Sequence, residues 1–181
     1  GSATNGGAVL VNSDASFTMV GGNIVGNNSV EFGGGVRVDG GCFTMLDGTV
    51  AGNTSARGGG IYVSGTMNMS GGTIDGNTAS AYGGGIHTGT ATVSVTGGLI
   101  SNNKAVKNYG GGIGVSQSAD VTLENCTITG NSGAKGGGVY DYGKLTINEG
   151  TIISDNTANG DETGGGGIFV NKAATLTMNG G

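Results

Sequence analysis

Carboxylates are the side chains that bring this sequence closest to a catalytic pattern. Hydrolysis of a glycosidic bond uses two carboxyl groups that face each other at a set separation. The closest acidic group in the chain consists of Asp120, Glu124, Asp141 and Glu149. We expect Asp120 and Glu124 to point outward from one strand, with Lys144 stacked over Asp120. We interpret this group as a surface ion pair, because such pairs are common and the carboxylates do not gather as a catalytic pair would.

The other reactive residues predict neither a metal site nor a covalent catalyst. Asp161 and Glu162 lie in the longest connection, but two carboxylates without further fixed oxygen ligands make a poor calcium site, so we expect a solvated loop. His87, the only histidine, has no second metal ligand nearby and no serine or cysteine nucleophile at a recognisable spacing. Cys42 and Cys126 lack the cysteine or histidine neighbours of a zinc site. We therefore predict no catalytic residue, no metal and no cofactor.

Aromatic and basic side chains recur at two places relative to each run of three glycines. The set just before the glycines, the flanking column, consists of Phe32, Arg57, Tyr82, Tyr109 and Lys135. The set after the aliphatic residue that follows the glycines, the third-strand column, consists of Leu10, Arg37, Tyr62, His87, Gly114, Tyr140 and Phe169. Exposed aromatic and arginine side chains beside a flat glycine surface can stack on a glycan or protein ligand. An alternative stays open, in which the rings stack on one another and shield the backbone between coils.

A repeat of about 25 residues must position these columns. Each repeat contains an apolar-polar-apolar triplet such as Phe17–Met19, then a corner such as Gly26-Asn27, then three glycines and an aliphatic residue such as Val36. Alternation over three to five residues predicts strands. The first residue of every corner is Gly, Asn or Asp, the types that tolerate a positive φ. Three short strands and three bends per repeat predict one coil of a parallel β-helix.

Stacking of the coils places equivalent residues above one another, about 4.8 Å apart. We predict six to seven such coils, with the second residue of each corner forming a ladder of side-chain amides. The ladder residues are Asn27, Asn53, Asn77, Asn103, Asn131 and Asn156. An extra residue before Ile153 predicts a β-bulge. Cys42 and Cys126 should be about 14 Å apart, beyond the roughly 7 Å Cα separation of a disulfide, so we predict two free thiols.

Composition limits the class of protein and its partners. The 181 residues include 44 glycines and no proline, and they carry a net charge of −5 with only seven Lys and Arg. Scattered basic residues on an acidic chain exclude nucleic acid as a partner, and no apolar run is long enough to cross a bilayer. We interpret residues 1–2 as a cloning scar and residues 3–181 as one β-helix domain, a fragment of a longer array. Open sheet ends without caps favour end-to-end self-association.

The repeat resembles a known family. Gly6-Gly7-Ala8-Val9 and the later glycine runs resemble the GGA-[ILV] motif of the polymorphic outer membrane protein autotransporters, and Ile24-x-x-Asn27 resembles their FxxN motif. The pattern is also similar to repeats of many bacterial cell-surface proteins. The resemblance implies a right-handed parallel β-helix that serves as an adhesin passenger or stalk, secreted or on the bacterial cell surface.

We therefore expect a non-catalytic segment that presents a lateral face to a host-cell or environmental glycan or surface protein. The predicted contact residues are Phe32, Arg37, Arg57, Tyr62, Tyr82, His87, Tyr109, Tyr140 and Phe169. One alternative is a lyase or glycoside hydrolase, because parallel β-helices also carry polysaccharide-active enzymes. A second alternative is ice binding by an outward polar ladder on a flat strand, formed by Thr18, Thr44, Asn68, Ser94, Thr122, Thr146 and Thr177.

Overall fold

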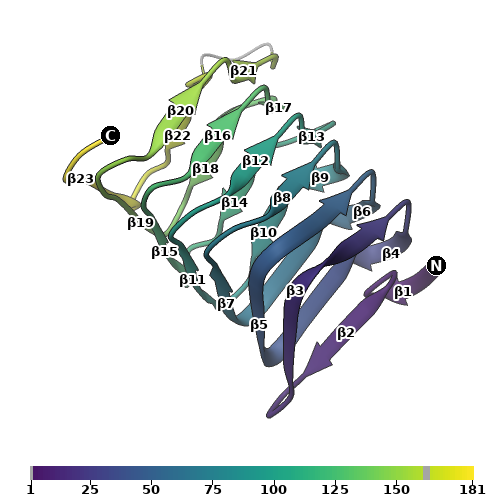
Figure 1. The fold of residues 1–181 in the computed structure, drawn as a ribbon. Coiled ribbons are helices and arrows are strands. Elements are labelled where there is room, and N and C mark those ends of the chain that lie inside the picture. Colours follow the sequence, from purple (N-terminus) through teal and green to yellow (C-terminus); the bar gives the residue numbers. More distant parts are fainter. Residues whose placement is uncertain (1, 161–163) are drawn as a thin grey trace.

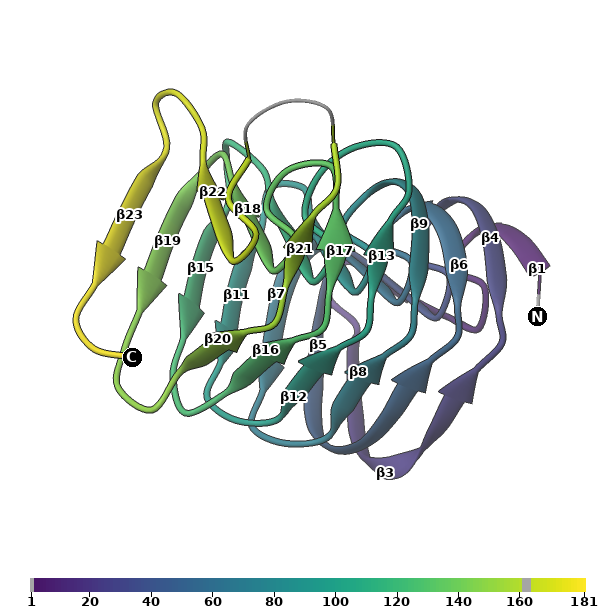
Figure 2. The ribbon, with the colours of Figure 1, turned by 90° about the horizontal axis from the view of Figure 1, so that it is seen from above.

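A computed structural model describes residues 2–160 and 164–181. The chain winds into a parallel β-solenoid of about six turns, and its two termini lie at opposite ends of the stack (Figure 1). Strands of successive coils lie side by side, as β11, β15, β19 and β23 do in Figure 2. All strand pairs are parallel, and equivalent positions of the repeat face each other. The predicted all-β solenoid is confirmed.

The first file of strands carries the apolar-polar-apolar triplets. Their alternating side chains place one row in the interior and one row outside, as the period of a strand requires. The file consists of β3 (Ser16–Val25), part of β5 (Val36–Ala51), part of β7 (Ile61–Met69), β11 (Thr92–Val95), β15 (Asp120–Leu123), β19 (Lys144–Ile147) and β23 (Thr175–Met178).

The second and third files complete the large, 16-stranded sheet. The second file continues β3 and β5 and then uses β8 (Thr73–Asp75), β12 (Leu99–Ser101), β16 (Thr127–Thr129) and β20 (Ile152–Ser154). The third file follows the glycine runs and consists of β2 (Val9–Asn12), the starts of β5 and β7, β10 (Ile86–Thr88), β14 (Ile113–Val115), β18 (Val139–Asp141) and β22 (Ile168–Val170).

A fourth file, which the sequence pattern did not predict, follows the asparagine corner. It forms a separate seven-stranded sheet of β1 (Ser2–Asn5), β4 (Asn28–Phe32), β6 (Thr54–Arg57), β9 (Thr78–Tyr82), β13 (Lys104–Ala105), β17 (Ser132–Gly133) and β21 (Thr157–Ala158). The expected three strands per coil are therefore joined by a fourth. Its inward residues are small, such as Ser55, Ala79 and Ala105, so the segment lacks the apolar alternation from which the other strands were predicted.

The core is a set of vertical apolar columns, and most of their members have no exposed surface. Val50, Ile74, Ile100 and Ile128 stack in the second file with 0% exposure. In the first file the rings of Phe17 and Phe43 lie stacked with centroids 5.2 Å apart. Each coil makes the same few contacts with its neighbouring coils. The stability of the fold is therefore the sum of these coil-to-coil contacts and does not come from one central core.

The corners and the amide ladder are confirmed. The first corner residue has positive φ in every coil, at Gly26, Gly52, Gly76, Asn102, Gly130 and Asp155. The backbone N–H and Nδ2 of Asn103 both donate to Oδ1 of Asn131, at 2.9 and 3.0 Å. The same pair of bonds joins each ladder asparagine to the next, from Asn27 to Asn156. The ladder thus satisfies polar groups that the corner would otherwise bury without partners.

Two further predictions concern single positions. The bulge expected before Ile153 is wrong, because Ile153 pairs with Ile128 without a register shift. The extra residue is accommodated in the connection between β19 and β20. Cys42 and Cys126 are free thiols, as predicted. The described part of the chain contains no helix that is long and apolar enough to cross a bilayer.

Candidate ligand-binding site

The structure brings the predicted site residues together on one lateral face. Parallel pairing runs along the third-strand column from Arg37 to Tyr62, then to His87, Gly114, Tyr140 and Phe169. The flanking column is aligned in the same way, since Phe32 pairs with Arg57, Arg57 with Tyr82, and Tyr109 with Lys135. These placements follow the sequence prediction, while their use in binding stays a prediction.

Side chains of the two columns interdigitate into one zigzag of rings. Tyr82 contacts His87 with centroids 5.6 Å apart, and Tyr82 also contacts Tyr109 at 6.0 Å. Tyr140 stacks on Tyr109 at 4.5 Å and on Phe169 at 5.5 Å. Many ring faces are therefore occupied by other rings, as the open alternative expected. Fewer ring faces are therefore free to stack on a ligand along this face.

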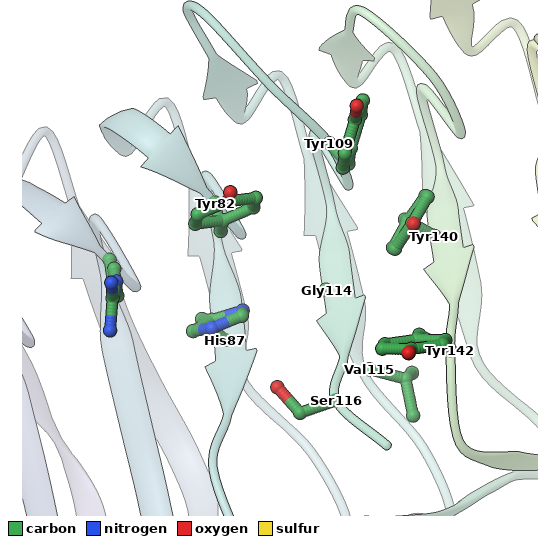
Figure 3. Close-up of a pocket in the computed structure, with 9 residues that line it drawn as sticks. Tyr82, His87, Tyr109, Gly114, Val115, Ser116, Tyr140 and Tyr142 are labelled. Carbon is green, nitrogen blue, oxygen red and sulfur yellow. The ribbon is translucent and has the colours of Figure 1, made fainter. Parts of the chain in front are cut away.

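The third-strand column has a gap at Gly114, its one member without a side chain, and the rings pass this coil through Tyr109 of the flanking column. A pocket of about 280 Å³ opens there, lined by Arg57, Tyr82, His87, Tyr109, Gly114, Val115, Ser116, Tyr140 and Tyr142. Figure 3 shows Tyr82 and His87 on one side of Gly114, and Tyr109, Tyr140 and Tyr142 on the other. The pocket therefore lies between the coil of β10 and the coil of β18.

His87 forms one wall of this pocket in an uncharged state at neutral pH. The pKa of His87 is lowered to about 4, mainly by burial and also by the positive charge of Arg57, while a backbone hydrogen bond with Gly114 partly opposes both effects. Burial disfavours the charged imidazolium because the protein interior solvates charge less well than water. The imidazole is thus a neutral ring in the pocket wall.

Hydroxyl groups and one guanidinium supply the polar part of the pocket. Tyr140 Oη accepts a hydrogen bond from Asn171 Nδ2 at 2.6 Å, which leaves its own O–H free to donate. Burial raises the pKa of Tyr140, and this ring therefore stays protonated at neutral pH. Ser116 is fixed in the floor, since its backbone N–H donates to Thr88 Oγ1 at 2.8 Å and its hydroxyl donates to the Thr88 carbonyl. Arg57 stands at the rim, with its side chain exposed.

The acidic group does not form a pair around a common cleft. Asp120 lies on the surface and accepts from Lys144 Nζ at 2.6 Å, which is the predicted ion pair. Asp141 is fully buried in the column between Val115 and Val170. Burial raises the pKa of Asp141, and a hydrogen bond from the Gly143 N–H partly offsets this.

Two other predicted features are the outward polar ladder and the acidic loop. The polar ladder is in register, with Ser94 between Asn68 and Thr122, and the Asp120–Lys144 pair interrupts the row beside it. Ice binding by this ladder stays a prediction that a thermal-hysteresis measurement would test. Asp161 and Glu162 lie outside the described residues. Across the described ranges, no three His, Cys, Asp or Glu side chains gather in a way that could hold a metal ion.

Comparison with known families agrees with this geometry. The family model for the right-handed β-helix region matches residues 34–180. The chain belongs to the right-handed β-helix family. No curated protein and no solved structure matches the chain significantly. The handedness implied by the sequence resemblance is thereby confirmed, and membership of the autotransporter adhesins stays a prediction.

Two features of this right-handed β-helix were not predicted from the sequence, the pocket at Gly114 and the burial of Asp141. The pocket at Gly114 was not predicted, although a glycine among aromatic and basic residues in one column was the signal for it. Tyr142 lines the pocket from the turn after β18, but it belongs to neither column. The burial of Asp141 was also not predicted. Asp141 stands two residues after Val139, and at this position the other coils carry the inward residues Val63, Thr88 or Val115, which could have indicated that Asp141 is buried.

Proposed function

We propose that this right-handed β-helix is a non-catalytic segment of a secreted or surface-attached bacterial protein and binds a glycan at the Gly114 pocket. The pocket is the observation that carries the proposal, because it is a concave site where tyrosine rings and hydroxyl groups meet. Binding sites for small ligands combine apolar and aromatic walls with a few placed polar groups.

A sugar ring fits the chemistry of this pocket. Its C–H faces can pack on aromatic rings, while its hydroxyl groups need hydrogen-bond partners. Tyr82 and Tyr109 offer phenolic groups to the pocket, and Ser116 and Tyr142 offer further hydroxyls. A protein ligand would instead need a larger continuous interface than a pocket of this size provides.

The solenoid provides the scaffold for such a role. Repeating coils extend a rod along one axis (Figure 1), and the third-strand column follows that axis from β2 to β22. This architecture supports the adhesin or stalk role that the autotransporter resemblance implies. Localisation to the cell surface or to the secreted fraction is part of the same proposal.

A glycan array followed by calorimetric titration tests the proposal. We expect a hit whose affinity falls at least about tenfold in Tyr142→Ala, since that ring lines the pocket. Tyr62→Ala is the matched control, because Tyr62 belongs to the third-strand column but does not line the pocket. Equal losses in both variants, or no binding to any array glycan, would contradict the proposal.

Catalysis on a polysaccharide is the second candidate, because the family fold is compatible with enzymes of that kind. It predicts that incubation with pectins or glycosaminoglycans yields new reducing ends or unsaturated products. Asp120→Asn and Glu124→Gln should then abolish product formation. Unchanged substrates after prolonged incubation would contradict this candidate.

A further inference from the structure

We infer that the Gly114 pocket selects sugars that carry a carboxylate, and that Arg57 binds this carboxylate at the pocket rim. The inference rests on the proposed function, since it specifies the class of glycan that the same pocket would take. Three observations support it: how Arg57 is held, what charge the pocket has, and where Arg57 lies relative to the recess.

Arg57 is held in place by rings and not by a carboxylate. Its guanidinium carbon lies 5.5 Å from the centroid of Phe32 and 5.9 Å from that of Tyr82. Arg37, one coil earlier in the third-strand column, instead pairs with Asp39 at 2.9 Å. Among the described residues no carboxylate forms an ion pair with Arg57. Its planar fork of donors is therefore oriented and available for a bidentate contact with a carboxylate.

The pocket carries a positive charge on a chain that is acidic overall. Arg57 is the one lining residue that is charged at neutral pH, since none of the residues that line the pocket is Asp or Glu and His87 is neutral there. Burial raises the pKa of Tyr62, and the positive charges of Arg37 and then Arg57 partly oppose this. The chain as a whole has a net charge of −5, so the positive field of Arg57 is local to the pocket. This field would favour an anionic ligand there.

The position of Arg57 suits a substituent on a bound ring. Arg57 pairs in register with Tyr82, and the coil of Tyr82 and His87 lies next to the coil of β14 that contains Gly114, so Arg57 lies two coils before Gly114 and reaches the pocket with its side chain. A sugar ring in the recess at Gly114 would lie beside Tyr109 and Tyr140, and a carboxylate on the side of the ring that faces β10 would extend past Tyr82 and His87 toward the guanidinium. The tyrosine hydroxyls and Ser116 would then bind the ring hydroxyls, while Arg57 sets the preference for the acid.

Calorimetric titration with oligogalacturonides and with their methyl esters tests this inference, because esterification removes the charge of each carboxyl group and adds only a methyl group. We expect the acid to bind at least about tenfold more tightly than the ester. Raising the salt concentration should weaken binding of the acid and leave binding of the ester unchanged. Glucuronate oligomers with matched esters, and a sulfated oligosaccharide without carboxylates, complete the panel.

Variants separate the carboxylate contact from the rest of the pocket. Arg57→Gln should lose the preference for the acid and keep the affinity for the ester, while Arg37→Gln should change neither. Thermal unfolding of both variants checks that the solenoid is intact. Equal binding of acid and ester, or tighter binding of the sulfated probe, would overturn the inference while leaving the proposed function standing. Absence of binding to every acidic, esterified and neutral glycan would overturn both.

Discussion

The imidazole of His87 lies over the backbone of Gly114, its partner in the parallel register between β10 and β14. A Cβ atom at position 114 would come within 2.8 Å of His87 Nδ1, closer than such atoms approach in proteins. The missing side chain therefore serves two purposes. It lets the histidine ring pack down on the strand, and it opens the pocket among the tyrosines.

Gly114→Ala is expected to impair binding more than folding. The added methyl group would push His87 toward the recess and reduce the space for a ligand. We expect a loss of at least about tenfold in affinity for the array glycan and a destabilisation of about 1 kcal/mol from overpacking. Gly21→Ala is the matched control, since no atom lies within 4 Å of a Cβ there. Unchanged affinity in Gly114→Ala would show that the recess does not hold the ligand.

His87 should titrate with a midpoint near its lowered pKa of about 4. As the only histidine, it gives imidazole signals that proton NMR can follow without ambiguity. Because the folded-state pKa lies below the usual 6.5, the folded state binds fewer protons between these values. Stability is then lost as the pH falls from about 6.5 to about 4, by at most about 3 kcal/mol. His87→Gln should remove this part of the acid sensitivity, and a midpoint near 6.5 would refute the buried, neutral state.

Asn77→Ala should be strongly destabilising. Asn77 Oδ1 accepts from both the backbone N–H and Nδ2 of Asn53 at 3.0 Å, and Asn77 Nδ2 donates to the Val50 carbonyl at 2.9 Å. Truncation leaves these buried groups without partners, and we expect a cost of about 3 kcal/mol or more in chemical unfolding. Asn68→Ala, on the outer face, should cost less than about 0.5 kcal/mol. Similar losses in the two variants would argue against the ladder.

Asp141→Asn should alter the dependence of stability on pH. Burial raises the folded-state pKa of Asp141 above 3.8, and its Oδ2 has no hydrogen-bond partner. The folded state therefore holds its proton more tightly than the unfolded state, so stability falls as the pH rises from 3.8 through the raised pKa. The difference in unfolding free energy between the variant and the native protein, measured at each pH, should grow over that range in favour of the variant. A difference that is constant with pH would contradict the buried carboxyl.

The two thiols should differ in reactivity. Cys42 is half-buried, whereas Cys126 is 1% exposed, and burial raises the pKa of Cys126. Since the thiolate is the reactive form, a thiol reagent should modify one cysteine in the folded protein and two after unfolding. Peptide mass spectrometry should assign the first site to Cys42. Rapid modification of Cys126 in the folded protein would contradict its placement.

Much of the fold was predictable because the repeat converts sequence equivalence into spatial contact. The spacing of Asn27, Asn53 and Asn77 was enough to predict their superposition, since parallel coils place equivalent residues above one another. The positive φ of Gly26 and Asp155 followed from the residue types at the corners. The strand of Thr54–Arg57 was missed because its inward side is made of small residues, which leave no apolar alternation in the sequence.

The candidate site was predictable only in outline. The columns and their order followed from the repeat, so Tyr62 and His87 were expected beside each other. The sequence did not reveal that Tyr82 packs on His87 across the two columns, because that contact depends on the lateral distance between β9 and β10. It also did not show that the ring faces are largely occupied, which leaves the recess at Gly114 as the accessible part.

By itself, the sequence determined the winding of this solenoid, the apolar residues inside three of its four strand files and the corners where it turns, because these depend on a two-residue side-chain period and on repetition along the chain. Only the tertiary structure decided where the lateral face is hollow, that Asp141 is buried, and that Arg57 is held by rings without a carboxylate partner among the described residues. These features depend on contacts between side chains from different files and coils. Such contacts are fixed by distances and rotamers that no spacing in the sequence specifies.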